Sequence, residues 1–162
     1  MGSSTTDGSR RDLFRSLTTF FHKKEVVIRP PYSASEILFD SCKICSGSCI
    51  EACEEKIIFR DAEGAVYLDF KVSGCSDCRK CMEVCEPGVL NDPKIFIDVK
   101  VKIDTNLCMA HNNTLCSACK DPCLENAIEF IGLFKPIVIS DLCTGCGYCV
   151  APCPSNAMVM YK

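Results

Sequence analysis

The sequence predicts a small α+β protein that consists of two tandem modules of the same design. The chain of 162 residues contains sixteen cysteines, which fall into four sets of four with none left over. The first cysteines of the sets lie at positions 42, 75, 108 and 143, in steps of 33, 33 and 35 residues. Repeats of roughly 20–50 residues usually indicate copies of one structural unit. Each copy is expected to contain a strand, a cysteine loop, a short helix and a second strand.

The spacing of the cysteines within a set indicates iron–sulfur ligation. The second set has the spacing C-x2-C-x2-C-x3-C, and the fourth has the same spacing followed by proline, which is the run of bacterial ferredoxins. Such a loop supplies three thiolates to one face of a tetrairon–tetrasulfur cube. We therefore predict two tandem ferredoxin-like 2[4Fe–4S] modules, small and cluster-stabilised, with four [4Fe–4S] clusters per chain. The predicted metal ligands are Cys42, Cys45, Cys49, Cys53, Cys75, Cys78, Cys81, Cys85, Cys108, Cys116, Cys119, Cys123, Cys143, Cys146, Cys149 and Cys153.

The first and third sets depart from the regular spacing. In the first set three residues separate the second cysteine from the third, and Gly47 among them is expected to absorb the extra residue with a positive φ. In the third set seven residues separate the first two cysteines. The alternative for these two sets is a degenerate loop with a lost or trinuclear cluster. His111 lies in the seven-residue insert, and because four thiols are already present we expect a surface histidine rather than a ligand.

Disulfides and zinc explain the cysteines less well. Disulfide frameworks of small secreted domains rarely place cysteines at three-residue intervals four times over. Zinc sites use C-x2-C pairs that lie a dozen or more residues apart, whereas three or four thiols within about 11 residues suit a cube better.

The four cysteine sets are expected to work in pairs, so that the two sets of a pair together hold two clusters. In two-cluster ferredoxins the fourth cysteine of each run ligates the other cluster, which requires a β-hairpin between the runs. Residues 61–64 (D-A-E-G) predict a turn between two strands, and the gap between the third and fourth sets has Gly132 or Pro136 near its bend. The middle gap instead predicts one long half-buried strand over residues 95–103.

We therefore pair the first set with the second and the third set with the fourth. One cluster is then held by Cys42, Cys45, Cys49 and Cys85, and the next by Cys75, Cys78, Cys81 and Cys53. The third is held by Cys108, Cys116, Cys119 and Cys153, and the fourth by Cys143, Cys146, Cys149 and Cys123. A nested arrangement, with the first set paired with the fourth and the second with the third, stays open.

The predicted domain organisation has three parts. A basic N-terminal tail covers residues 1–27, the first module covers 28–93 and the second covers 94–162. Residues 1–24 carry a net charge of +3, while residues 25–162 carry −6. Within the tail, helical spacing places five apolar side chains on one face of a short amphipathic helix: Leu13, Phe14, Leu17, Phe20 and Phe21. This helix is expected to pack on the body of the protein, dock on a partner protein or make weak contact with a membrane surface.

The remaining features limit the function. The sequence has no nucleophile–base pair, no glycine-rich phosphate loop and no flavin or nicotinamide fingerprint, so we expect one-electron transfer and no enzyme activity. Four oxidised clusters would take the net charge from −3 to roughly −11, which disfavours nucleic acid as a partner. No apolar stretch approaches the roughly 18 residues of a transmembrane helix. Arg10 and Arg11 resemble a twin-arginine export motif, but no apolar region of about 7–15 residues follows, so we expect a cytoplasmic protein.

Over nearly its whole length the chain resembles the NapF-type ferredoxins, which are accessory proteins of the periplasmic nitrate reductase system. The resemblance is carried by the arginine pair at 10–11, the segment I-R-P-P-Y at 28–32, and the third set with its insert, C-M-A-H-N-N-T-L-C-S-A-C-K-D-P-C. The final run C-T-G-C-G-Y-C-V-A-P-C-P-S-N-A-M also matches, whereas the extra residue in the first set departs from the family pattern.

The resemblance implies a cytoplasmic protein with four clusters and a defined partner. It would bind the molybdoenzyme catalytic subunit of the nitrate reductase before export, assist its maturation and pass electrons to it. Two alternatives stay open, an electron-transfer subunit of a larger oxidoreductase and a free-standing soluble carrier.

Overall fold

The computed structural model describes residues 26–162, so the amphipathic helix predicted in the N-terminal tail lies outside the described residues. The elements are short: η1 (Glu36–Ile44, a 3-10 helix), α2 (Ser48–Ala52), β1 (Ile58–Arg60), β2 (Val66–Leu68), α3 (Lys80–Glu83), β3 (Lys100–Ile103), β4 (Ile128–Ile131), β5 (Lys135–Val138) and β6 (Met158–Tyr161). Within residues 26–162, no helix has the length and apolar character needed to cross a bilayer.

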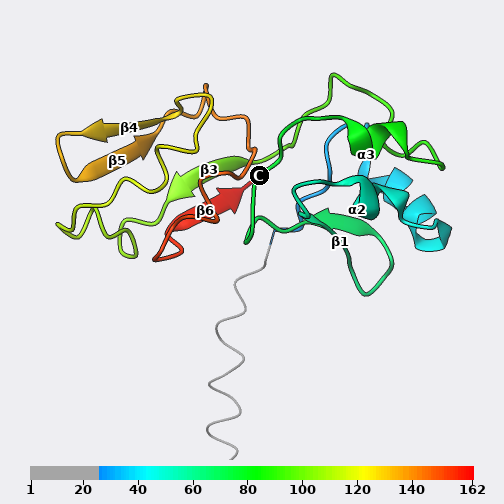
Figure 1. The fold of residues 1–162 in the computed structure, drawn as a ribbon, viewed down its shortest axis with the longest axis horizontal. Coiled ribbons are helices and arrows are strands. Elements are labelled where there is room, and N and C mark those ends of the chain that lie inside the picture. The colour runs from blue at the N-terminus through cyan, green and yellow to red at the C-terminus, as the bar shows by residue number, and fades with distance from the viewer. Residues whose placement is uncertain (1–25) are drawn as a thin grey trace, which may run out of the picture.

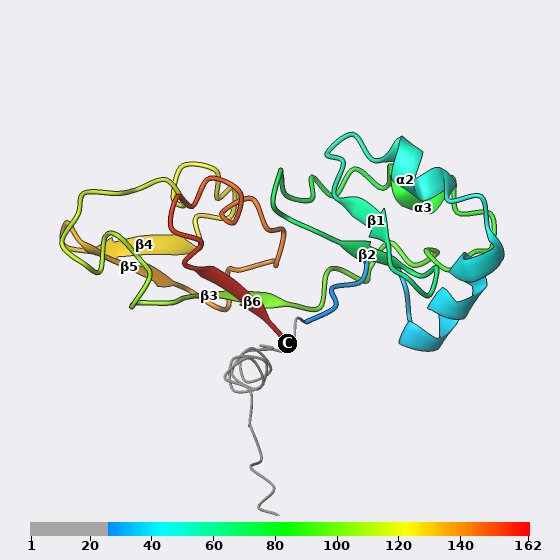
Figure 2. The ribbon, with the colours of Figure 1, turned by 90° about the horizontal axis from the view of Figure 1, so that it is seen from below.

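These elements gather into two groups at opposite ends of an elongated molecule (Figures 1 and 2). The first group contains η1, α2, β1, β2 and α3, and we call it the first half. The second group contains β3 to β6, and we call it the second half. Strand β6 runs back so that the C-terminal residue lies near the middle of the molecule (Figure 1).

The first half is organised around the hairpin of β1 and β2. The two strands are antiparallel, with Ile58 opposite Leu68 and Arg60 opposite Val66. The Asp61 carboxylate closes the connecting turn by accepting hydrogen bonds from the backbone N–H groups of residues 63 and 65, at 3.0 and 2.9 Å. The predicted turn at residues 61–64 is therefore confirmed.

The second half contains two antiparallel pairs, β4 with β5 and β3 with β6. The bend between β4 and β5 includes Gly132, whose φ of 67° lies in the left-handed region that favours glycine. Pro136 lies inside β5, opposite Phe130, so of the two residues expected near the bend only Gly132 is there. Strands β3 and β6 join the beginning of this half to its end, with Ile103 opposite Met158.

The long strand predicted over residues 95–103 is wrong in its extent. The predicted alternation is present, because Ile97, Val99 and Val101 are buried while Asp98 and Lys100 are exposed. However, only Lys100–Ile103 form a strand. Residues 95–99 lead from one half to the other, and no strand within the described residues pairs with them, so their extended backbone lacks a ladder.

The repeat unit is also less regular than predicted. A short α-helix occurs in the loops of the first two cysteine sets, whereas turns replace it in the third and fourth. The first set begins within a 3-10 helix, η1, which contains Cys42, and no strand of the described residues precedes it. An apolar pair follows the fourth cysteine of each set, and all four pairs are buried: Ile57 and Ile58, Val89 and Leu90, Ala127 and Ile128, Ala157 and Met158.

Cysteines form a large part of the core. Seven of the sixteen are buried, and they pack with the aliphatic residues of three adjoining clusters. Val150 and Met160 pack against the main core cluster of each half. The two halves therefore meet through continuous apolar packing rather than through the linker alone.

Candidate metal centres

The sixteen thiols come together as four groups, and each group takes three thiols from one set and one from the neighbouring set. We name these groups site 1 (Cys42, Cys45, Cys49 and Cys85), site 2 (Cys75, Cys78, Cys81 and Cys53), site 3 (Cys108, Cys116, Cys119 and Cys153) and site 4 (Cys143, Cys146, Cys149 and Cys123). No disulfide joins any of the sixteen cysteines.

Small cavities define sites 1 and 4. One cavity is lined by the four cysteines of site 1 together with apolar residues that include Val66 and Leu90. Another is lined by the four cysteines of site 4 together with Val101, Ile128 and Val138. In both cavities three thiols come from one cysteine set. The fourth thiol comes from the set at the other end of the connecting hairpin.

Electrostatic effects between thiols indicate which cysteines are neighbours in sites 2 and 3, with Cys49 of site 1 also close to site 2. Cys81 in site 2 is buried, and its pKa is raised to about 12 by desolvation first and then by neighbouring thiols, those of Cys75, Cys49, Cys78 and Cys53. Desolvation likewise raises the pKa of Cys119 in site 3 to about 11, with further contributions from Cys153, Cys108 and Cys116. The thiols therefore group as expected if the first set is paired with the second and the third set with the fourth. They do not group as the nested arrangement requires.

Burial dominates the acid–base behaviour of the innermost thiols. Desolvation raises the pKa of Cys49 and of Cys75 to about 11, and that of Cys149 to about 12. Neighbouring thiols are the next causes at Cys49 and Cys149, because several thiolates in one cavity repel one another. Four ionised thiolates can share such a cavity only when cations compensate their charge, as bound iron would.

Backbone conformation explains why the loops curl around these cavities. Gly145, between the first two cysteines of the fourth set, has a φ of 73°, and a Cβ there would clash with the carbonyl oxygen of Val99. Gly47 in the first set has a φ of 86°, which confirms that it absorbs the extra residue of that loop. Both positions need the backbone freedom of glycine.

Two backbone N–H groups point at sulfur in matching places of the two halves. The N–H of Leu90 donates to the Sγ of Cys85 at 3.4 Å, and the N–H of Ala157 donates to the Sγ of Cys153 at 3.2 Å. Each acceptor is the fourth cysteine of its set, the one that crosses to the other group. Such bonds stabilise a thiolate and raise the potential of a cluster that it holds.

Arg60 also belongs to the surroundings of site 1, a role that the sequence did not indicate. Its guanidinium donates to the carbonyl oxygens of Cys42 at 2.7 Å and Cys45 at 3.2 Å, and it lies 3.8 Å from the Sγ of Cys45. The same group reaches Gly64 O at 3.1 Å, so one side chain ties the β1–β2 turn to the irregular first loop. An arginine at the end of an apolar strand gives no signal of this contact, because the contact is set by the register of the hairpin.

A buried tyrosine supports site 2. The side chain of Tyr32 is almost fully buried, and its O–H donates to the carboxylate of Asp77, in the loop of the second set. Burial, and then this hydrogen bond, raise the pKa of Tyr32 far above its ordinary value. The backbone of Tyr32 also bonds Ile95 and Asn91, so this residue fixes the cysteine loop to the connecting segment.

The seven-residue insert of the third set is a compact turn held by Asn112. The Asn112 side-chain amide donates to the carbonyl oxygens of Thr105, Asn106 and Cys108 at 3.1, 3.2 and 2.8 Å. His111 lies in this turn, but it is partly buried rather than exposed, and its Nδ1 has no hydrogen-bond partner within the described residues.

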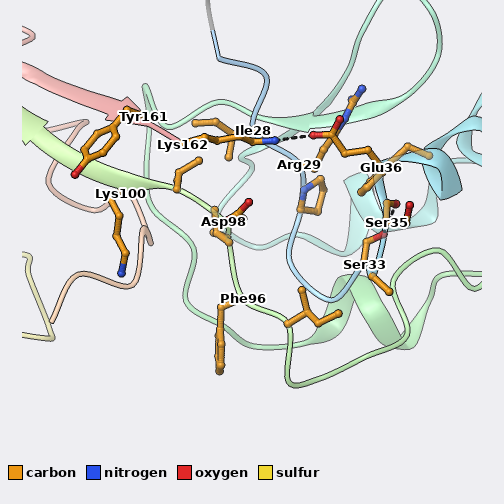
Figure 3. A pocket seen from close by; sticks show the side chains of 16 residues that line it. Ile28, Arg29, Ser33, Ser35, Glu36, Phe96, Asp98, Lys100, Tyr161 and Lys162 are labelled. Carbon is orange, nitrogen blue, oxygen red and sulfur yellow. Dashed lines mark hydrogen bonds and ion pairs between the residues drawn. The ribbon is translucent and has the colours of Figure 1, made fainter. Parts of the chain in front are cut away.

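A separate groove of about 580 Å³ lies between the halves and contains no cysteine. Figure 3 shows Lys162, the residue after β6, reaching across the groove to Glu36 of η1; the distance from Nζ to Oε1 is 2.6 Å. Arg29 lies beside Glu36, while Asp98 and Lys100 line the other side (Figure 3). The charges largely compensate one another, and the contact holds the C-terminal strand against the first half.

The donor chemistry fits an iron–sulfur cube better than a single ion. Within residues 26–162, no three His, Cys, Asp or Glu side chains converge closely enough to ligate one metal ion. A structural zinc needs all its sulfurs at about 2.3 Å from one point. A cube instead holds each thiolate on a different iron, which suits thiols that line a shared cavity at wider separations.

Comparisons with known proteins agree with this chemistry. The 4Fe–4S binding domain family matches residues 136–159, a stretch that contains the fourth cysteine set. The chain is 37% identical, over 94% of its length and 93% of the relative's, to the ferredoxin-type protein NapF of Escherichia coli K12. It is 35% identical, over 83% of its length and 79% of the relative's, to the ferredoxin-type protein NapF of Haemophilus influenzae. A ferredoxin-type protein NapG of E. coli K12 is 28% identical over 79% of the chain and 66% of its own length.

Proposed function

Because the chain belongs to the NapF family of ferredoxin-type proteins, we propose that it is a cytoplasmic polyferredoxin with four [4Fe–4S] clusters that serves a molybdoenzyme. Its partner in this proposal is the catalytic subunit of a periplasmic nitrate reductase, which it binds before export and helps to mature. It transfers electrons and assists assembly, and it does not catalyse a reaction of its own.

The observation that carries the cluster assignment is the exchange of the fourth thiol. Cys85 lies with the first set and Cys53 with the second, while Cys153 lies with the third set and Cys123 with the fourth. This exchange is the ligation pattern of two-cluster ferredoxins, and it occurs once in each half. We therefore propose two ferredoxin-like modules, at residues 28–93 and 94–162, behind a basic tail at 1–27.

Bound clusters would supply one-electron transfer, and the chain's own residues would control it. Three cysteines of each set hold one group, and the fourth ties that group to its neighbour. Arg60 places positive charge beside site 1. Apolar residues such as Val66 and Val101 line the cavities and exclude water from the sulfurs.

The partner rests on the family resemblance and on charge. A cluster-loaded body of strongly negative charge with a basic tail suits docking to a protein with complementary patches and not binding to nucleic acid. The alternative is an electron-transfer subunit of a larger oxidoreductase, which would remain bound to its complex instead of to a precursor.

Anaerobic purification of the tagged chain from nitrate-grown cells tests both parts of the proposal. We expect about 16 irons per chain, four for each [4Fe–4S] cluster, and co-purification of an unexported molybdoenzyme precursor. A chain without residues 1–24 is the matched control, because it should keep its iron and lose the precursor if the tail is the docking element. Full iron with only membrane-bound or hydrogenase-type subunits would favour the alternative, and absence of iron would refute the cluster assignment.

A further inference from the structure

The loops of the second and fourth cysteine sets touch each other across the two halves. The backbone N–H of Cys75, the first cysteine of the second set, donates to the carbonyl oxygen of Cys146, the second cysteine of the fourth set, at 2.7 Å. One ligand loop is therefore hydrogen-bonded directly to another, although the two residues are far apart in sequence. We call this contact and its surroundings the junction.

Side chains on both halves hold the junction in place. The O–H of Tyr148, in the fourth loop, donates to the carboxylate of Glu55 at 2.7 Å, and Ser73 donates to the other oxygen of the same carboxylate at 2.5 Å. These hydrogen bonds lower the pKa of Glu55, which keeps it ionised and able to accept both. The bond from Tyr148 therefore crosses between the halves beside the bond from Cys75.

Two glycines allow the close approach. A Cβ on Gly74 would lie 2.5 Å from the backbone nitrogen of Tyr148 and 2.8 Å from the carbonyl oxygen of Cys146. A Cβ on Gly147 would clash with the ring of Phe70. Since Gly74 does not have a positive φ, only the space at the junction requires glycine there.

Within each half, the packing shows which sites adjoin. Helices α2 and α3, which carry Cys49 of site 1 and Cys81 of site 2, contact each other, and both thiols belong to one core cluster. Cys119 of site 3 and Cys149 of site 4 belong together to another core cluster. Sites 1 and 2 are therefore neighbours, and so are sites 3 and 4.

From these contacts we propose that the four sites form a line in the order 1, 2, 4, 3, and that Gly74, Tyr148 and Glu55 are the positioning residues that make sites 2 and 4 the neighbouring pair across the halves. The order differs from the order in sequence, and it leaves sites 1 and 3 at the two ends, where electrons would enter and leave. An electron crossing the junction oxidises the site it leaves and reduces the site it enters, with no bond broken and no proton moved. An external one-electron donor supplies it. This proposal rests on the proposed clusters.

Electron paramagnetic resonance of the reduced holoprotein, prepared anaerobically with dithionite, tests the order. A Cys45→Ala, Cys116→Ala chain keeps sites 2 and 4 intact, and we expect spectra broadened by spin–spin interaction between them. A Cys78→Ala, Cys146→Ala chain keeps sites 1 and 3, and we expect two unbroadened signals. Broadened spectra in Cys78→Ala, Cys146→Ala and unbroadened spectra in Cys45→Ala, Cys116→Ala would overturn the order.

A second comparison uses the chain with all sixteen cysteines. Gly74→Ala should weaken the interaction between sites 2 and 4 and leave the interactions within each half unchanged. Gly88→Ala controls for the replacement of a glycine away from the junction, because a Cβ there meets nothing within 4 Å, although its positive φ adds backbone strain. Lys162→Met removes a contact between the halves that involves no cysteine loop. Tyr148→Phe should weaken the same interaction less than Gly74→Ala.

Iron counting separates the two proposals. Full iron with no change in Gly74→Ala would refute the junction while the cluster assignment stands. Low iron in the unaltered chain would instead refute the proposed function, on which the order depends.

Discussion

The guanidinium of Arg60 donates a hydrogen bond to the carbonyl oxygen of Cys45 at 3.2 Å and lies 3.8 Å from the sulfur of the same residue. Arg60 is on β1, and Cys45 is in the loop with the extra residue. The hairpin that separates the first two cysteine sets thus places a fixed positive charge beside site 1.

Removing this charge should lower the reduction potential of one of the four clusters. In Arg60→Met, a reduced and more negative site 1 loses both a donor to its sulfur and a neighbouring cation. A net loss of about 1 kcal/mol, the usual size of one hydrogen bond, corresponds to roughly 40 mV for a one-electron couple. Redox titration followed by electron paramagnetic resonance measures the shift. The potential of site 1 in Arg60→Lys should lie between those of the unaltered chain and of Arg60→Met.

Lys56→Met is the control for the loss of a cation from the same half. The Lys56 ammonium donates to the carbonyl oxygen of Glu51 and not to a sulfur, so the four potentials should stay within the error of the titration. Equal shifts in both variants would assign the effect to net charge and not to the contact of Arg60 with site 1.

Gly47→Ala should impair site 1 selectively. A left-handed backbone costs an alanine roughly 1–2 kcal/mol, and the added Cβ would lie 2.6 Å from a guanidinium nitrogen of Arg60. The measured iron content should fall from about 16 towards about 12 atoms per chain, since each cluster holds four. Gly88 also has a positive φ, but a Cβ added there would meet no atom within 4 Å. The iron content of Gly88→Ala should therefore not fall. Unchanged iron in Gly47→Ala would mean that the first loop tolerates another conformation.

Single replacements of cysteine should report the exchange of the fourth thiol. Because Cys85 lies with Cys45 in site 1, Cys85→Ala and Cys45→Ala should alter the same paramagnetic signal. Cys53→Ala should instead alter the signal that Cys75→Ala alters. If Cys85→Ala matches Cys75→Ala, each set holds its own cluster and the exchange is refuted.

The sequence predicted most of what depends on spacing along the chain. The turn at residues 61–64, the bend at Gly132 and the positive φ of Gly47 all follow from local chemistry, and the structure confirms each of them. The grouping of thiols across each hairpin could also be predicted, because two loops joined by a hairpin must face each other.

Contacts that depend on packing could not be predicted. The segment 95–99 has a strand pattern, but among residues 26–162 the course of the chain places no partner strand beside it, so it does not join a sheet there. Arg60 and Tyr148 act across the structure on loops that are distant in sequence. A seven-residue insert predicts a loop, but not that Asn112 closes it or that His111 becomes partly buried.

Removal of iron should unfold the protein. Each half has only short strands and a core made partly of cysteines, and domains of this size are marginal without a metal or a disulfide. Without iron the buried thiols would stay protonated, because burial raises their pKa, and no metal would join the loops that carry them. Anaerobic treatment with an iron chelator should abolish the far-ultraviolet circular dichroism of the fold in parallel with the loss of iron, and added iron and sulfide should restore it under reducing conditions.

Reducing conditions during chelation are the necessary control, because disulfides formed among sixteen thiols would trap a non-native chain. A metal-free, fully reduced chain that still melts cooperatively would show that apolar packing, including that of Val150 and Met160 between the halves, is sufficient for the fold.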